Sequence, residues 1–178
     1  MPNTDPTQLD ADAPPTIDLD RKPPVKVSEK QKEEFFKAFL ADRPYEEEFD
    51  LLNGNYRIRL KALSMKENNA LLTQIAYDRD KGRIEGVNDY YFSRVAHYRL
   101  GLALVSVNDK PFGEEVTPAN SPTDKETGIT YVARRADLFA DWSMVKMAAV
   151  QAALQEFDQR VLVLVDAVSN PDFWKAGA

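Results

Sequence analysis

The chain has 178 residues, with 29 acidic and 23 basic side chains, a net charge of −6 and a pI near 4.9. It contains no cysteine, which excludes disulfides, thiolate metal ligands and cysteine nucleophiles. An acidic chain without a basic cluster binds phosphate backbones poorly, so we expect no nucleic-acid partner. The longest apolar run, VLVLV at 161–165, is far too short to span a membrane, so we expect no membrane partner.

Residues 1–27 are predicted to form an extended or disordered arm. Six of the eleven prolines and five aspartates lie there, with little apolar surface to offset the entropy cost of ordering. Two interpretations stay open: a disordered tail, or a peptide that becomes ordered on a partner or a neighbouring subunit. Residues 28–178 are expected to form a single domain, in keeping with the length.

The first predicted helix starts at Ser28, which opens a sequence with capping-box spacing, SEKQ. Asp42-Arg43-Pro44 is expected to end it. Its apolar residues follow at helical spacing and are Phe35, Phe36, Phe39 and Leu40.

The stretch EEEFDLLNGNYRIRL, residues 46–60, predicts a β-hairpin over 45–61. Asn53-Gly54 favours a two-residue type I′ turn, in which both central residues take positive φ. That turn sets the register, in which the facing pairs are Leu51 with Tyr56, Asp50 with Arg57, Phe49 with Ile58 and Glu48 with Arg59. Opposite charges then share one face and apolar residues the other. The charges are therefore explained by a solvent-facing strand surface, without catalysis.

Two more helices are predicted after the hairpin. Ser64-Met-Lys-Glu67 is a second capping box, and its helix should run to about Lys81. The residues expected to face inward are Leu71, Leu72, Ile75 and Ala76. Asn88 should cap the next helix, whose inward stripe is Tyr91, Val95, Tyr98, Leu102 and Val105. A turn at 108–113 and an open loop over 114–128 are expected to follow.

Residues 129–170 contain neither glycine nor proline and predict one helix of up to about 40 residues. A seam of small and apolar residues with three-four spacing runs along it: Ala133, Ala136, Ala140, Ser143, Met147, Val150, Leu154, Phe157, Val161, Leu164 and Val168. The seam could pack on the chain's own helices or on a partner helix. VLVLV could instead be a buried strand. The predicted fold class is mainly α with a small β-hairpin (α+β): a helical bundle with one long C-terminal helix and an extended N-terminal arm.

We find no pattern that indicates catalysis or a cofactor. His97 is the only histidine, and it lies opposite the apolar stripe of its helix, so a metal or triad role is not expected. Phosphate-loop, nucleophile-elbow and zinc-protease motifs are absent from the sequence. We expect a non-enzymatic protein with no cofactor and no metal. Arg134-Arg135 could pair with the acidic 114–126 loop or with an acidic partner.

The candidate partner-binding residues are the large members of the seam and three aromatic residues: Met147, Val150, Leu154, Phe157, Val161, Leu164, Trp142, Phe173 and Trp174. Large aromatic residues dominate the energetics of many protein interfaces. Phe173-Trp174 follows Pro171, which should stop the helix. This short hook could fold back onto its own helix or enter a pocket of a neighbouring copy.

The stretches YRIRLKALSMKENNALLTQI (56–75) and HYRLGLALVSVNDKPFG (97–113) resemble a pattern of tailed-phage morphogenesis proteins, namely tail assembly chaperones and small baseplate or hub subunits. The pattern is a hairpin that ends in a leucine-rich step, a helix with a charged cap, and a second helix that ends near an Asn or Asp turn. The matching residues are Leu60, Leu63, Ser64, Leu102, Ala103, Val105, Val107, Asn108 and Asp109. The resemblance spans about 60 of the 178 residues.

The resemblance implies a non-enzymatic subunit or assembly chaperone of a tail or baseplate, present in the virion or in the host cytoplasm during assembly. Its partners would be other phage structural proteins or further copies of itself. The alternative is a cytosolic adaptor or regulatory module that binds one partner helix. A third possibility is an enzyme that uses scattered carboxylates and tyrosines, such as Tyr90, Tyr91 and Tyr98.

Overall fold

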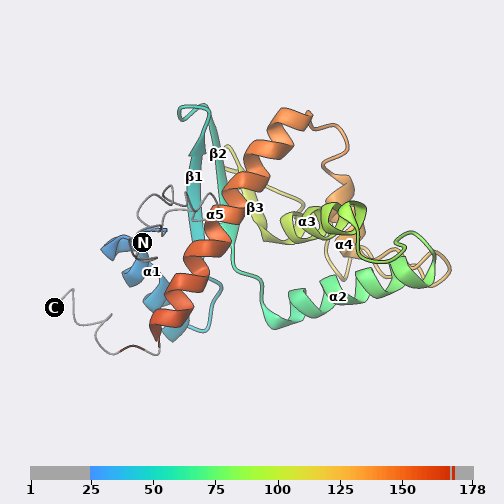
Figure 1. Ribbon diagram of the computed structural model, residues 1–178, viewed down its shortest axis with the longest axis horizontal. Coiled ribbons are helices and arrows are strands. Elements are labelled where there is room, and N and C mark those ends of the chain that lie inside the picture. Colours follow the sequence, from blue (N-terminus) through green and yellow to red (C-terminus); the bar gives the residue numbers. More distant parts are fainter. Residues whose placement is uncertain (1–24, 169, 171–178) are drawn as a thin grey trace, which may run out of the picture.

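The computed structural model describes residues 25–168 and residue 170, so almost all of the predicted arm and the Phe173-Trp174 hook lie outside it. The fold is α+β and mainly helical, with a long C-terminal helix, as predicted (Figure 1). The elements in chain order are α1 (Glu29–Leu40), β1 (Glu46–Leu51), β2 (Tyr56–Lys61), α2 (Met65–Asp80), α3 (Asp89–Ala103), β3 (Leu104–Val107), β4 (Lys110–Pro111), α4 (Tyr131–Asp137) and α5 (Met144–Val168).

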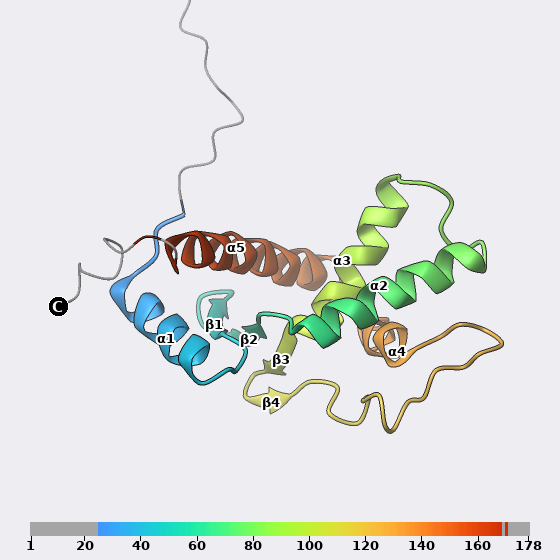
Figure 2. The same cartoon turned by 90° about the horizontal axis from the view of Figure 1, so that it is seen from below.

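The strands form one antiparallel sheet in the order β1-β2-β3-β4. The predicted hairpin is confirmed, with Asp50 opposite Arg57 and Phe49 opposite Ile58. Asn53 has a φ of 57° and Gly54 a φ of 79°. Helix α5 crosses one face of β1 and β2, α1 flanks β1, and α2, α3 and α4 gather beside the sheet (Figures 1 and 2).

The sheet is larger than the predicted hairpin because the chain leaves helix α3 earlier than expected. Val105 belongs to the predicted helical stripe, but α3 ends at Ala103 and Leu104–Val107 pairs with β2. Asn108 and Asp109 then take positive φ values of 47° and 62° and return the chain into β4. Apolar residues continue across the helix end without interruption, so the pattern alone did not separate helix from strand.

Two hydrophobic clusters form the core of the described residues. The first joins the sheet, α1, α5 and the end of α3, and at its centre the Tyr45 ring lies 5.5 Å from Phe35 and 5.9 Å from Phe157. The second joins α2, α3 and α4 through Leu71, Ile75, Tyr98, Leu102, Val132 and Ala133. The second cluster and the loop before α4 position the site described below.

Both predicted capping boxes are confirmed, at Ser28 and at Ser64. The inward face predicted for α2 is only half correct. Leu71 and Ile75 are buried, whereas Leu72 is 55% exposed and Ala76 also faces solvent. The other buried residues of this helix are polar, Gln74 and Asp78. A prediction based on the spacing of apolar residues cannot find them.

The predicted single helix over 129–170 is wrong: it is divided into α4 and α5 by residues 138–143. The turn lets Phe139 stack on Phe112, with ring centroids 5.0 Å apart, and lets Trp142 meet Phe139 edge-on at 4.9 Å. Ser143 then starts α5 by accepting a hydrogen bond from the Lys146 main-chain N–H over 3.3 Å. VLVLV lies within α5, so the strand alternative is also wrong.

Arg135 holds α4 against the end of α3 and the β3–β4 region by donating to main-chain carbonyls. The acidic loop also interacts with both arginines, because Glu115 acts to raise the pKa of Arg135 against the effect of burial, and Arg134 adds to the hydrogen bonds from Thr127 in lowering the pKa of Asp124. Its Nε donates to the Gly101 carbonyl over 2.6 Å, and its Nη1 to that of Gly113 over 2.7 Å. Its Nη2 donates to the carbonyls of Leu104 and Phe112 over 3.2 and 3.0 Å. Burial lowers the pKa of this guanidinium, while Glu67, Tyr131 and Glu115 oppose that shift.

Two glycines let α4 and the Arg135 side chain approach this closely. A Cβ on Gly101 would lie 3.2 Å from the Ala136 main-chain nitrogen, which is tighter than ordinary packing. A Cβ on Gly113 would lie 3.1 Å from Arg135 Cζ, and Gly113 has a φ of 65°, which disfavours other residues. The close contact of Arg135 with this part of the chain therefore depends on the absence of a side chain at both Gly101 and Gly113.

We predict that Arg135→Met lowers the free energy of unfolding by about 3 kcal/mol, because four largely enclosed carbonyls lose a charged donor. The measurement is urea unfolding followed by far-UV circular dichroism. The matched control is Arg134→Met, the neighbouring position, which should change stability by less than about 0.5 kcal/mol. Equal losses in the two variants would contradict the role of the carbonyl contacts.

Candidate protein-binding site

The structure brings the predicted seam residues of α5 together on one face, but that face packs on the chain's own core. The buried members are Met147, Val150, Leu154, Phe157 and Leu164. Val161 and Trp142 are partly buried against the same cluster. Phe173 and Trp174 lie outside the described residues. The middle of the seam is therefore used inside the chain, and only members near its two ends, such as Ala140 and Val168, are open to a partner.

The last turns of α5 carry apolar side chains on their solvent side as well. Leu162 is 63% exposed and Val165 50% exposed, and with Val163 and Val168 they form what we call the apolar end of α5. A helix that packs on a core by one face normally presents polar residues to solvent. Phe39 and Leu40 on α1, which shares the first core cluster with α5, are also exposed.

A pocket of about 360 Å³ opens at the other end of α5, and we call it the α3–α5 pocket. It lies between α3, the end of α4, the 138–143 linker and the first turn of α5. Its lining residues are Tyr90, Ser93, Arg94, His97, Tyr98, Ala136, Asp137, Phe139, Ala140, Trp142, Met144 and Met147. The break that the sequence did not predict therefore creates this pocket.

The wall of the α3–α5 pocket is aromatic and rich in methionine. Phe139 and Met147 are buried parts of the first cluster, and Trp142 packs against it. Met144 is 84% exposed. Lys146 Nζ lies 3.6 Å from the centre of the Trp142 ring, which fixes one side of that ring by a cation–π contact. Such walls accept aromatic or aliphatic side chains.

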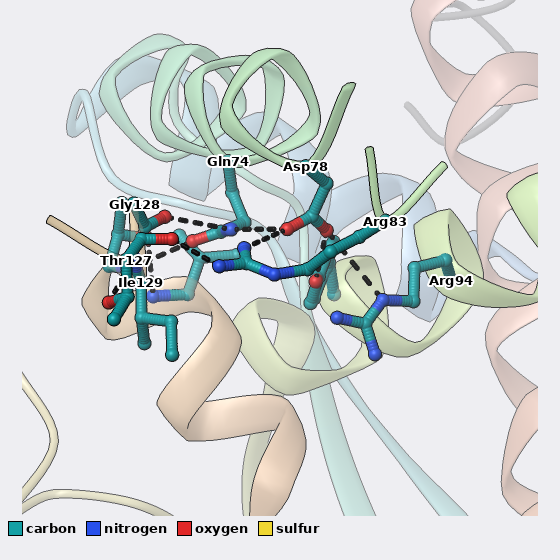
Figure 3. A network of polar contacts seen from close by, with 10 residues as sticks. Gln74, Asp78, Arg83, Arg94, Thr127, Gly128 and Ile129 are labelled. Atoms are coloured by element: carbon teal, nitrogen blue, oxygen red, sulfur yellow. Dashed lines mark hydrogen bonds and ion pairs between the residues drawn. The ribbon is translucent and has the colours of Figure 1, made fainter. Parts of the chain in front are cut away.

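A buried carboxylate, Asp78, contacts Tyr98 and Arg94, which line the pocket; Figure 3 shows Asp78 with Arg94. Asp78 has no exposed surface and accepts hydrogen bonds from Tyr98 Oη over 2.5 Å, Arg83 Nη1 over 2.7 Å and Gln74 Nε2 over 3.0 Å. Arg94 Nε lies 3.6 Å from the other side of the group, at Oδ2. This network ties α2 to α3.

The same network holds the loop that leads into α4. Gln74 Nε2 also donates to the Gly128 carbonyl over 3.2 Å, and Gln74 Oε1 accepts from the Thr130 main-chain N–H over 2.9 Å. Arg83 Nη2 donates to the Thr127 carbonyl (Figure 3). The end of the predicted open loop is thus fixed by buried Gln74 of α2 and by Arg83, which follows that helix.

The charges of the network do not balance. One carboxylate, Asp78, faces two guanidinium groups, Arg83 and Arg94, which leaves one positive charge in excess. The Arg94 Nε is buried without a hydrogen bond, and its guanidinium lies 5.2 Å from the Tyr98 ring centre. Figure 3 shows its terminal nitrogens pointing away from Asp78. Arg94 also lines the pocket, so it can take a carboxylate from a ligand there.

His97 lines the α3–α5 pocket and its Nδ1 lies 2.7 Å from the Ser93 carbonyl on the same helix. Within the described residues, no group of three or more His, Asp or Glu side chains is placed to hold a metal ion. Over the same residues, no helix is both long and apolar enough to cross a membrane.

Comparison with protein-family models, with curated proteins and with solved structures finds no match.

The sequence pointed to Trp142 and Met147 but not to the pocket that they line. It also missed the buried network. One signal was available for the network: Gln74 and Asp78 are polar, four residues apart, and alternate with Leu71 and Ile75 on the inward side of the predicted helix. The pocket had no comparable signal, because it depends on where the helix breaks.

The Tyr98 contact predicts a pH dependence of stability. Burial, and then the hydrogen bond to Asp78, raise the pKa of the Tyr98 phenol above its usual 10. Burial likewise raises the pKa of Tyr45 to about 12. The unfolded chain loses these protons first, so the stability is fully present below pH 10 and is lost as the pH rises above it. The slope is at most about 1.4 kcal/mol per pH unit for each tyrosine.

We expect Tyr98→Phe to lower stability by about 1–2 kcal/mol at pH 7, because Asp78 loses a donor. The same variant should lose less stability than the wild type between pH 9 and pH 11, since one titrating group is gone. Urea unfolding at each pH measures both effects. Parallel curves for the two proteins would show that Tyr98 does not contribute to the alkaline loss.

Proposed function

We propose that the chain is a non-enzymatic phage morphogenesis protein, a structural or assembly subunit of a tail or baseplate that acts through protein–protein contacts. It would function in the virion or in the host cytoplasm during assembly. The observation that carries the proposal is the apolar end of α5, where large apolar side chains face solvent on the side that a packed helix normally keeps polar.

Burial of this surface by a binding partner would be energetically favourable. Burying an exposed leucine or valine side chain contributes roughly 1.5–3 kcal/mol. Leu162 is 63% and Val165 50% exposed, so covering the two could add roughly 2–3 kcal/mol to an association, before the cost of ordering both partners. An exposed apolar surface with polar neighbours is typical of interaction sites.

The resemblance to tail and baseplate proteins supplies the biological context of the proposal. Its two stretches, 56–75 and 97–113, are far apart in sequence, yet they meet in the sheet, where Ile58 pairs with Val107 and Leu60 with Leu104. Their adjacency is what a shared structural unit would require. It supports the interpretation that the two stretches belong to one pattern.

The alternative is a cytosolic adaptor that binds one partner helix. Leu162, Val165 and Val168 recur every three residues and form a stripe along α5, onto which a helix could pack. An adaptor would form a defined complex with a single partner and would need no larger particle.

The test of the proposal is quantitative mass spectrometry of purified particles and of the lysate that produced them. Stoichiometric recovery in particles would identify a structural subunit. Presence in the lysate with absence from particles would identify an assembly chaperone. If the host cell produces no particle, the phage proposal is wrong and the adaptor alternative replaces it.

We predict that Leu162→Glu reduces recovery in particles, or in the chaperone's complex, at least tenfold. A charge at the centre of an apolar interface is costly to bury, while the exposed position tolerates it in the free chain. The matched control is Gln155→Glu, which adds the same charge at an exposed position of α5 outside the apolar end. Equal recovery of the two variants, with equal thermal stability, would contradict the use of this surface.

A further inference from the structure

We propose that the α3–α5 pocket receives the Asp172-Phe173-Trp174 segment of a second copy of this chain, so that copies associate head to tail. The role of this contact in assembly rests on the proposed function, but the contact itself requires only this chain. The pocket is in the described residues, and the segment directly follows the end of α5 in sequence.

The pocket wall matches an aromatic side chain. Phe139, Trp142 and Met147 offer ring faces and a thioether, which contact aromatic rings favourably. Its volume of about 360 Å³ is within the usual range of about 300–1,000 Å³ for ligand pockets. The N-terminal arm, residues 1–27, contains no Phe, Trp or Tyr and therefore matches this wall less well.

The charges of the segment match those of the pocket at both ends. Asp172 precedes the two aromatic residues and Lys175 follows them. The pocket carries Arg94, which has terminal nitrogens directed away from Asp78, and the exposed carboxylate of Asp137. An arginine and a carboxylate can form two parallel hydrogen bonds, which would fix the orientation of the segment.

The groove between α1 and β1 does not fit this segment. It lies between α1 and β1, with a volume of about 660 Å³, and its lining includes Glu34 and the consecutive acids Glu46, Glu47 and Glu48. An entering Asp172 would meet like charges there. Of these two, the α3–α5 pocket is therefore the better match.

The segment of the same chain cannot reach the pocket. The pocket lies at the first turn of α5, and Met147 and Val168 are 21 residues apart along the helix, which is about 32 Å at 1.5 Å per residue. Trp174 is six residues beyond Val168, and an extended chain of that length spans at most about 22 Å. The occupant must then come from another copy.

A contact of this kind joins different surfaces of the two copies. One copy contributes the end of α5 and the next contributes the start. Such heterologous contacts close into rings or continue as filaments, depending on the rotation between copies. A pairwise symmetric dimer is not expected from this contact alone.

The experiment combines two variants that each lack one half of the contact. A chain that ends at Asn170 keeps the pocket but lacks the segment. Ala140→Trp keeps the segment but fills the pocket from an exposed position of its wall. By sedimentation velocity, the full chain should form larger species as its concentration rises, and each variant alone should remain monomeric. Mixed together, the two should form a 1:1 heterodimer and nothing larger.

A charge exchange tests the orientation. Asp137→Lys should weaken the association about tenfold because it would face Lys175, and adding Lys175→Glu should restore it. Asp137 is exposed, so the substitution should leave the fold intact, which the melting temperature checks. Ala76→Trp, on the exposed side of α2, is the matched control for Ala140→Trp and should associate like the wild type.

Three outcomes would overturn the inference. The full chain could stay monomeric at every concentration up to its solubility limit. The truncated chain could still associate, or the mixture of the two variants could form no heterodimer. A monomeric full chain whose melting temperature falls on truncation would place the segment on its own chain instead. Head-to-tail association of a chain whose host cell produces no particle would disprove the proposed function and leave this inference standing.

Discussion

The placement of α4 depends on a single guanidinium that donates to main-chain carbonyls. Arg135 contacts the carbonyls of Gly101 and Leu104, where α3 ends and β3 begins, and those of Phe112 and Gly113, just after β4. One side chain thus fixes the helix-to-strand transition and the start of the following loop. Because α4 leads directly into the 138–143 linker, the direction in which α5 starts depends on the same contact.

Buried charges join the helices at two further places. Asp78 joins α2 and α3 and anchors the loop before α4. Glu47, on the inner face of β1, pairs with Arg160 of α5 and accepts from Gln31 of α1 over 2.7 Å. Each carboxylate is shared among several donors, which compensates for the loss of its hydration. At Asp78 two guanidinium groups face one carboxylate, so Arg94 can still bind a second carboxylate at the pocket.

The sequence predicts those parts of the fold that short-range rules determine. The Asn53-Gly54 turn fixed the hairpin register, and serines 28 and 64 fixed two helix starts. What failed was decided by tertiary contacts. The 129–170 region has no helix breaker, yet stacking of Phe139 on Phe112 favours a turn. Leu104–Val107 suits a helix or a strand, and the free edge of β2 selects the strand. The pocket follows from the break between α4 and α5 and was not predictable.

The break before α5 changes what the apolar seam can do. An uninterrupted helix with one seam would offer the same surface along its length and would favour lateral pairing with a similar helix. In the folded chain the seam is used internally, and the two ends of α5 become chemically different. The first turn of α5 borders the aromatic pocket, which contains Arg94. The last turns carry exposed Leu162 and Val165, and the Asp172-Phe173-Trp174 segment follows them in sequence. A chain with unlike ends would suit the proposed head-to-tail contact, because each added copy would present again the surface that the next one needs.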